Sequence, residues 1–148
     1  MEQTTGLKRS TSDKYYTKSD VVNHCIELLK KNIKISKSDL IIEPSAGNGS
    51  FIEKIKLMSS NYKFYDLKPE SSEITEQDYL DLNYQSIQEE FKKIHVIGNP
   101  PFGRQSSLAI KFIKKSCEFC NTISFILPKS FKKDTLKRAF PPSFHLVF

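Results

Sequence analysis

Hydrophobic residues recur at helical spacing near the start of this chain. Within residues 19–32, "SDVVNHCIELLKKN", Val22, Ile26 and Leu29 lie three and four positions apart. This spacing places them on one face of an α-helix, and Ser19 is the candidate N-cap residue. The pattern predicts an amphipathic helix from Ser19 onward.

Short apolar runs separated by polar stretches predict strands. Four such runs occur: "LII" at 40–42, "KFYD" at 63–66, "IHVIG" at 94–98 and "TISFIL" at 122–127. The last of them ends directly before Pro128, and the third is followed by Asn99 and two prolines. Between the runs, residues 51–58 read as a second helix. Residues 107–120 read as a third, with apolar positions supplied by Leu108, Ile110, Phe112 and Ile113.

Strands that alternate with helices predict an α/β domain with a mainly parallel sheet. Ligands of such sheets bind where the loops gather, at the carboxyl ends of the strands. The informative loops are therefore those that follow Ile42, Tyr65, Ile97 and Leu127.

Length and composition suit one folded domain. The chain has 148 residues, of which 38% are hydrophobic and 27% charged. We expect a flexible segment at 1–14 and a single domain at 15–148. No apolar run approaches the ~20 residues of a membrane span, and no secretory signal is recognised at the N-terminus. The odd number of cysteines, three, favours a reducing compartment, which predicts an intracellular protein of the cytoplasm or nucleus.

Cys117 and Cys120 form one CxxC pair in "SCEFCNT". A structural zinc site needs two further ligands at matching spacing, and the chain has no second pair. We therefore predict no metal site and interpret both cysteines as small apolar residues near the end of a helix.

The formal net charge of +6 favours a polyanionic partner. Residues 128–138 hold five Lys or Arg against one Asp, which predicts a nucleic-acid-binding face made by Lys129, Lys132, Lys133, Lys137 and Arg138. A second cluster, Lys30, Lys31, Lys34 and Lys37, is interpreted as a solvated helix face and loop.

The segment "IIEPSAGNGSF" places Glu43 at a strand end and Gly47 and Gly49 in the following turn. Glycines there allow positive φ and close approach of a ligand. The NAD fingerprint needs a third glycine, and Ile52 stands at that position.

Two carboxylates follow the next strands. Asp66 ends the second predicted strand, where a carboxylate can accept hydrogen bonds from both hydroxyls of a ribose, and Asp78 follows a poorly marked third strand region. Each also suits a turn or a helix cap. With the glycine turn, they suggest a nucleoside-binding edge.

"HVIGNPPFG" contains the most unusual loop of the chain. Proline restricts the residue before it, so Asn99 and Pro100 are each held in an extended conformation. The Asn99 amide oxygen and the Pro100 carbonyl are two neighbouring acceptors that match the two hydrogens of an amino group. Phe102 offers a flat face to a planar ring. The alternative is a plain Pro-Pro turn.

"NPPF" after a strand, preceded by "EPSAGNGSF", resembles the S-adenosylmethionine-dependent N6-adenine methyltransferases. The resemblance runs from "YYT" at 15–17 to "ISFILPKSF" at 123–131, with the cofactor motif before the catalytic motif as in that family. It implies a Rossmann-like, doubly wound sheet of the class I methyltransferase type.

The resemblance also implies roles for individual residues. Glu43, Gly47 and Gly49 would line the methionine end of S-adenosylmethionine, Tyr16 and Thr17 would approach its carboxylate, Asp66 its ribose and Asp78 its adenine amino group. The complete cofactor set it implies is Tyr16, Thr17, Glu43, Pro44, Ala46, Gly47, Gly49, Asp66, Asp78 and Asn99. The catalytic set it implies is Asn99, Pro100, Pro101 and Phe102. The backbone near Phe131 would border the pocket.

Two departures from the family stand out. After "FILPKSF" at most one of the family's two closing strands fits, so the resemblance implies a sheet that is truncated or minimal at its C-terminal end. No separate target-recognition domain is recognised, which suggests a partner subunit for that task.

The leading hypothesis is methyl transfer to adenine N6 in DNA or RNA. Two alternatives remain: a non-catalytic methyltransferase-like nucleic-acid-binding subunit, and a methyltransferase acting on protein glutamine. A dehydrogenase is disfavoured because His24, His95 and His145 are not placed for catalysis.

Overall fold

The computed structural model describes residues 17–129, 131 and 138–145. Helices and strands alternate through most of this part of the chain, as the hydrophobic pattern predicts. In order they are α2 (Ser19–Asn32), β2 (Leu40–Glu43), α3 (Ile52–Met58), β3 (Asn61–Asp66), β4 (Thr75–Glu76), the 3-10 turn η1 (Tyr79–Asp81), α4 (Gln85–Glu90), β5 (Ile94–Gly98), the 3-10 turn η2 (Arg104–Ser106), α5 (Ser107–Cys117) and β6 (Thr122–Phe125).

The five strands form one sheet in the order β4-β3-β2-β5-β6. Every neighbouring pair is parallel, with Leu40 of β2 opposite Asn61 on one side and Ile94 on the other. The chain therefore builds the sheet outward from β2, first in one direction and then in the other. This confirms the predicted α/β, doubly wound, parallel architecture.

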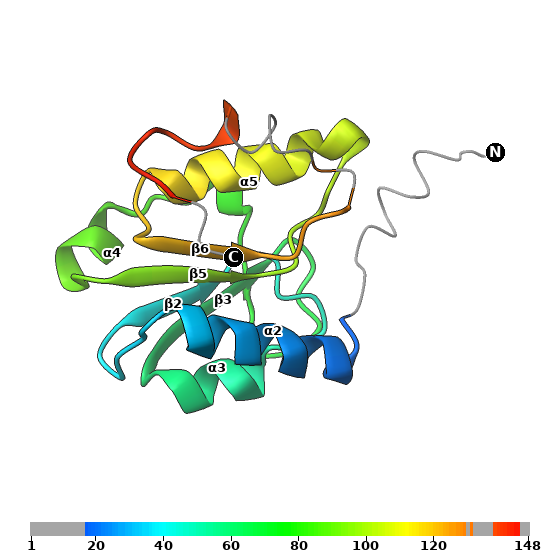
Figure 1. The fold of residues 1–148 in the computed structure, drawn as a ribbon. Coiled ribbons are helices and arrows are strands. Elements are labelled where there is room, and N and C mark those ends of the chain that lie inside the picture. The colour runs from blue at the N-terminus through cyan, green and yellow to red at the C-terminus, as the bar shows by residue number, and fades with distance from the viewer. Residues whose placement is uncertain (1–16, 130, 132–137, 146–148) are drawn as a thin grey trace.

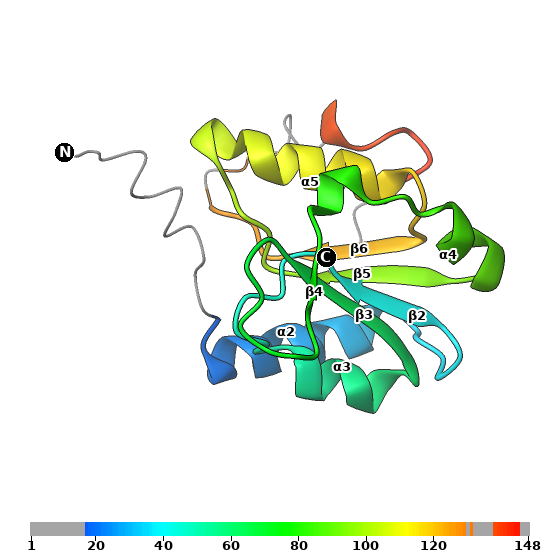
Figure 2. The same cartoon turned by 180° about the vertical axis from the view of Figure 1, so that it is seen from behind.

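Helices cover both faces of the sheet. Figure 1 shows α2 and α3 on one face and α5 on the other, and Figure 2 shows the β4 edge from behind. Because successive strand residues point to opposite faces, β2 contributes Ile41 to the core under α2 and α3, and Leu40 and Ile42 to the core under α5. Two apolar cores thus hold the sheet between two helical layers.

Helix α2 has the predicted bounds and the predicted buried face, which is Val22, Ile26 and Leu29. The expectation that Ser19 caps it is wrong. Lys18 is the N-cap residue, and no side chain caps the helix. Asp20 lies in the first turn, where a negative charge is favourable to the helix dipole.

The third predicted helix is α5, which begins at Ser107. Its buried residues are Ala109, Phe112, Ile113 and Ser116, whereas Leu108 is partly buried against the same core. Cys117 and Cys120 are free thiols at and just beyond its end. Burial raises the pKa of the Cys117 thiol to about 11, which keeps it protonated at neutral pH.

In the part of the chain that the structure describes, no helix is long and apolar enough to cross a membrane.

Candidate functional site

The candidate site lies where the carboxyl ends of β2 and β5 meet. These adjacent parallel strands lead into loops that diverge to opposite faces, into α3 and α5 respectively. Such a switch point leaves a crevice between the two loops, the usual place for a ligand in this architecture. Figure 1 shows the carboxyl ends of β5 and β6 at the same end of the molecule as the start of α2.

The turn after β2 is shaped by two glycines with positive φ, +60° at Gly47 and +89° at Gly49. An added Cβ at Gly47 would meet no atom within 4 Å, so the backbone is open to a ligand there. At Gly49 the same Cβ would lie 2.9 Å from the Ile52 side chain. The predicted positive φ of both glycines is confirmed, and Gly47 presents the open side of the turn.

Asp66 holds this turn against the end of β3. Its Oδ2 accepts a hydrogen bond from the Gly47 N–H at 2.8 Å, and its Oδ1 accepts one from the Lys68 N–H at 2.9 Å. The Ala46 N–H donates to the Tyr65 carbonyl at 2.8 Å beside them. Each carboxylate oxygen can accept more than one hydrogen bond. The expected contact of Asp66 with ribose hydroxyls stays a prediction.

Asp78 caps the 3-10 turn η1, where its side chain accepts from the Leu80 N–H at 3.0 Å. The helix-cap alternative is therefore observed. The residue is half-buried and follows the short strand β4, as expected. Its role at the adenine amino group stays a prediction.

Glu43 is a buried acid at the end of β2, with a relative exposure of 2%. Its Oε1 has no hydrogen-bond partner among the described residues. Burial, and secondarily the charge of Asp66, raise the pKa of this carboxyl well above its ordinary 4.5. The Cβ position of Gly98, at the end of β5, lies only 3.2 Å from Glu43 Cγ. Glu43 thus sits between the two strands of the switch point with an unsatisfied acceptor.

The loop after β5, residues 99–103, is called the Asn99 loop below. It is held from both sides. The Ser45 hydroxyl, in the loop after β2, donates to the Asn99 carbonyl at 3.1 Å, and the Asn99 Nδ2 donates to Thr17 Oγ1 at 3.3 Å. The Phe102 carbonyl accepts from the N–H groups of Leu108 and Ala109 at 3.0 and 3.1 Å, which anchors the loop to α5.

Burial differs along the loop. Pro100 is buried, while Asn99, Pro101 and Phe102 are half-buried. Neither the Asn99 Oδ1 nor the Pro100 carbonyl accepts a hydrogen bond from a described residue. Two acceptors are therefore available on an anchored loop.

Several predicted residues are placed at the same end of the sheet. The structure brings together Thr17, Glu43, Pro44, Ala46, Gly47, Gly49, Asp66 and Asn99 through the hydrogen bonds above and the turn they share. Tyr16, Lys132, Lys133 and Lys137 lie outside the described residues. Lys129 and Arg138 are exposed, and the Phe131 N–H donates to the Pro128 carbonyl at 2.9 Å.

Ser45 has no predicted role, although it lies inside the glycine motif. The contact of Thr17 with Asn99 also differs from its expected approach to the cofactor. These contacts join residues 54 and 82 positions apart. In the sequence, the only signal of these contacts is the hydroxyl of Ser45, two residues after the end of β2.

A hollow of about 360 Å³ lies beside the site, lined by the start of α2, the glycine turn, the start of α3, Ser71 and Glu73. Its lining includes Asn48 and Gly49 but none of Glu43, Asp66 and Asn99. We therefore place the candidate site at the carboxyl ends of β2 and β5 and not in this hollow. Among the described residues, no three His, Cys, Asp or Glu side chains cluster as a metal site would need.

Comparison with known proteins identifies a methyltransferase-like domain. A family described as "EDM2 methyltransferase-like domain" matches residues 34–148. Two curated relatives from Haemophilus influenzae, type II methyltransferases M.HincII and M.HindII, are each 27% identical over 103 residues, which is 69% of this chain. The chain spans about a fifth (19%) of the length of each relative.

Proposed function

This chain belongs to the family of EDM2 methyltransferase-like domains, and from that premise we propose that it transfers a methyl group from S-adenosylmethionine to the N6 amine of adenine in nucleic acid. The observation that carries the proposal is the anchored Asn99 loop. It presents the Asn99 Oδ1 and the Pro100 carbonyl as two acceptors at the switch point of the sheet.

The residues at this edge fit a cofactor with a cationic end and a nucleoside. Glu43 offers a buried acceptor without a partner, and Gly47 offers open backbone. Asp66 ends the neighbouring strand β3 and Asp78 follows β4, where a ribose and a purine amino group would extend. When bound, S-adenosylmethionine supplies an electrophilic methyl group on a sulfonium.

The Asn99 loop would activate the amine by holding it. An adenine amine is a weak nucleophile because its lone pair is delocalised into the ring. Hydrogen bonds from its two N–H groups to Asn99 Oδ1 and Pro100 C=O favour a tetrahedral nitrogen and stabilise its developing positive charge. The amine proton then leaves to water. In this account Phe102 stacks on the base.

Thr17 and Ser45 would orient these acceptors. Because the Asn99 Nδ2 donates to Thr17, the amide oxygen faces the other way. The Asn99–Pro100 peptide has no N–H, so its carbonyl is its one hydrogen-bonding group, and Ser45 fixes that peptide plane. The ring of Pro100 and the following proline restrict the Pro100 backbone. A fixed plane before Pro100 therefore also restricts the direction of the Pro100 carbonyl.

The nucleic-acid substrate is supported by charge and by similarity. The net charge is +6, and the chain is similar to type II methyltransferases over 69% of its length. A base within a duplex would have to be flipped out to reach the loop, whereas single strands present it directly.

The test is identification of the methylated product. The full chain is incubated with methyl-labelled cofactor and, separately, with single- and double-stranded DNA, RNA and a protein extract. The polymers are then digested and their nucleosides separated. We expect label in N6-methyladenine nucleosides from DNA or RNA.

Other outcomes would assign the chain elsewhere. Label in protein glutamine would replace the proposal with a protein methyltransferase. Calorimetric binding of cofactor or nucleic acid, without transfer to any polymer, would indicate a non-catalytic subunit.

A further inference from the structure

Six exposed lysines gather at the amino-terminal end of the sheet, opposite the candidate site. They come from the end of α2, from the segment that leads into β2 and from the segment that leads into β5. We call them the lysine surface: Lys30, Lys31, Lys34, Lys37, Lys92 and Lys93.

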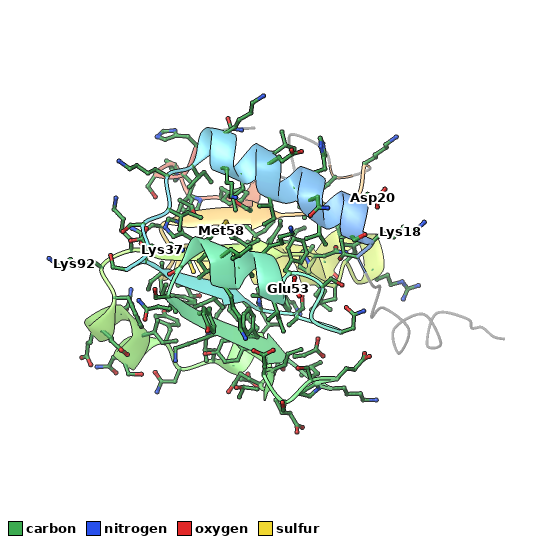
Figure 3. The ribbon with its side chains drawn as sticks, turned by 90° about the horizontal axis from the view of Figure 1, so that it is seen from below. Lys18, Asp20, Lys37, Glu53, Met58 and Lys92 are labelled. Carbon is green, nitrogen blue, oxygen red and sulfur yellow. The ribbon has the colours of Figure 1, made fainter. Side chains whose placement is uncertain are left out.

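The parallel pairing of β2 and β5 brings these segments together. The Leu40 N–H donates to the Lys93 carbonyl at 3.0 Å, which joins the two strand entrances although they are more than fifty residues apart in sequence. Figure 3 shows Lys37 and Lys92 at one end of the molecule and Lys18 at the other. A sequence cluster of four lysines thus becomes a surface of six.

The charges of this surface are poorly compensated. None of the six lysines forms an ion pair with a described residue. Asp39 lies there too and interacts electrostatically with Lys93, but its carboxylate is buried and bonded to His95. Glu89 and Glu90 are exposed at the end of the preceding helix α4.

At the opposite, carboxyl end of the sheet, the exposed side chains along the β3–β4 edge carry more negative than positive charge. Glu70, Glu73 and Glu76 are exposed there, accompanied by Lys68 and by Lys56 of α3, which forms an ion pair with Glu73. A polyanion is therefore repelled from that edge and attracted to the lysine surface.

We propose that the lysine surface binds the phosphodiester backbone of a nucleic acid, at a place separate from the candidate site. Exposed lysines neutralise phosphates as flexible point charges and read no sequence. Binding releases condensed counterions, so affinity falls steeply with salt. The surface would hold a flanking segment of a long polymer, independently of any methyl transfer.

Helix dipoles explain only part of this pattern. Lys30 and Lys31 lie in the last turn of α2, where positive charge stabilises the helix end. Lys37 Nζ donates to the Leu57 carbonyl at 2.6 Å, which gives it a structural contact. Lys34, Lys92 and Lys93 lie outside the helices and make no such side-chain contact with the described residues, so they are the positions to test.

The experiment measures fluorescence anisotropy of labelled 24-nucleotide DNA and RNA against the full chain, from about 50 to 200 mM salt. The triple variant K34Q/K92Q/K93Q is compared with K63Q/K111Q/K114Q, which removes the same charge from other surfaces. We expect the test variant to lose about tenfold in affinity at the lower salt. Its log–log salt slope should become shallower by about 2, since each lost phosphate contact contributes about 0.7–0.9.

Four results would overturn the proposal: equal losses in both variants, an unchanged salt slope, a fall in melting temperature without loss of binding, or binding of polyglutamate but not of nucleic acid. Methyl transfer is assayed in parallel on a short oligonucleotide. If methyl transfer persists and the lysine substitutions do not weaken nucleic-acid binding, this inference is rejected and the proposed function stands.

Discussion

Glu43 shows how a residue can favour ligand binding at the expense of the unliganded fold. Its carboxyl is almost fully buried, and one oxygen lacks a partner among the described residues. Desolvation of such a group is unfavourable unless a partner compensates it. A ligand that donates a hydrogen bond or brings a positive charge would remove this penalty.

Glu43→Gln is expected to stabilise the unliganded protein at high pH. Below pH 4.5, the ordinary pKa of this carboxyl, the acid is protonated in both the folded and unfolded states, and the variant should match the wild type. Above it, the unfolded chain ionises while the raised pKa disfavours ionisation of the folded carboxyl, so wild-type stability falls as pH rises until the folded group also ionises. At pH 8 the variant should gain about 1–3 kcal/mol in free energy of unfolding, measured by urea denaturation.

The exposed Glu53 supplies the control for this prediction. Glu53→Gln on the exposed side of α3 should change the free energy of unfolding at pH 8 by no more than about 0.5 kcal/mol. With S-adenosylmethionine present, Glu43→Gln should lose most of the ligand-induced stabilisation. Equal stability of Glu43→Gln and wild type at both pH values would contradict the assigned penalty.

At the residue scale, the sequence predicts groups whose conformation is set locally. Prolines restrain Asn99 and Pro100, and glycines in a turn, such as Gly47 and Gly49, indicate positive φ. It does not predict that Thr17 and Ser45 contact Asn99, because these contacts depend on how distant loops converge. Nor does it predict that Asp66 holds Gly47.

At the element scale, the loops after β2 and β5 act as one unit through the Ser45–Asn99 hydrogen bond. Each loop begins at a central strand that is buried on both sides. A rigid base of this kind favours a fixed position for the acceptors of the Asn99 loop.

Ser45→Ala should therefore weaken turnover more than cofactor binding. Loss of one neutral hydrogen bond of about 0.5–1.5 kcal/mol predicts a roughly twofold to tenfold fall in kcat. The KM for cofactor should change little, and Ser45→Thr, which keeps the hydroxyl, should restore much of the rate. An unaltered kcat in Ser45→Ala, or equal losses in both variants, would reject this positioning role.

Element prediction succeeded where the hydrophobic pattern was strong. Helix α2 and strand β5 follow from periodicity and from a long apolar run. Strand β4 has two exposed residues and pairs only with the end of β3, so no local pattern marks it. The cap of α2 was missed because Lys18 occupies that position without any side-chain cap.

At the scale of the whole molecule, the two ends of the sheet differ in chemistry. The carboxyl end holds the candidate site, whereas the amino end holds the lysine surface and a buried polar network. In that network His95 bonds Asp39 through Nε2 at 2.8 Å and Thr122 through Nδ1 at 2.7 Å. These bonds tie together the starts of three adjacent strands, β2, β5 and β6.

Asp39→Asn should lower stability at neutral pH by about 1 kcal/mol, since it weakens a charge-assisted hydrogen bond. Burial acts to raise the pKa of Asp39, but hydrogen bonds from His95 and Ser36, with the charges of His95 and Lys93, lower it overall. A lowered pKa gives stability that is present above the ordinary value of 3.8 and is lost as pH falls through the folded value. Urea denaturation should show the two proteins converging below about pH 3.8. A gap that persists in strong acid would contradict this account.

The anchored Asn99 loop is the central claim, and Asn99→Ala tests it most directly, with Asn23→Ala on the exposed face of α2 as control. Methyl transfer to adenine-containing oligonucleotides and calorimetric cofactor binding are measured on the same preparations. We predict that Asn99→Ala lowers transfer by about 10²–10³-fold while cofactor affinity stays nearly unchanged. Transfer at the wild-type rate, or parallel loss of transfer and cofactor binding, would contradict the account.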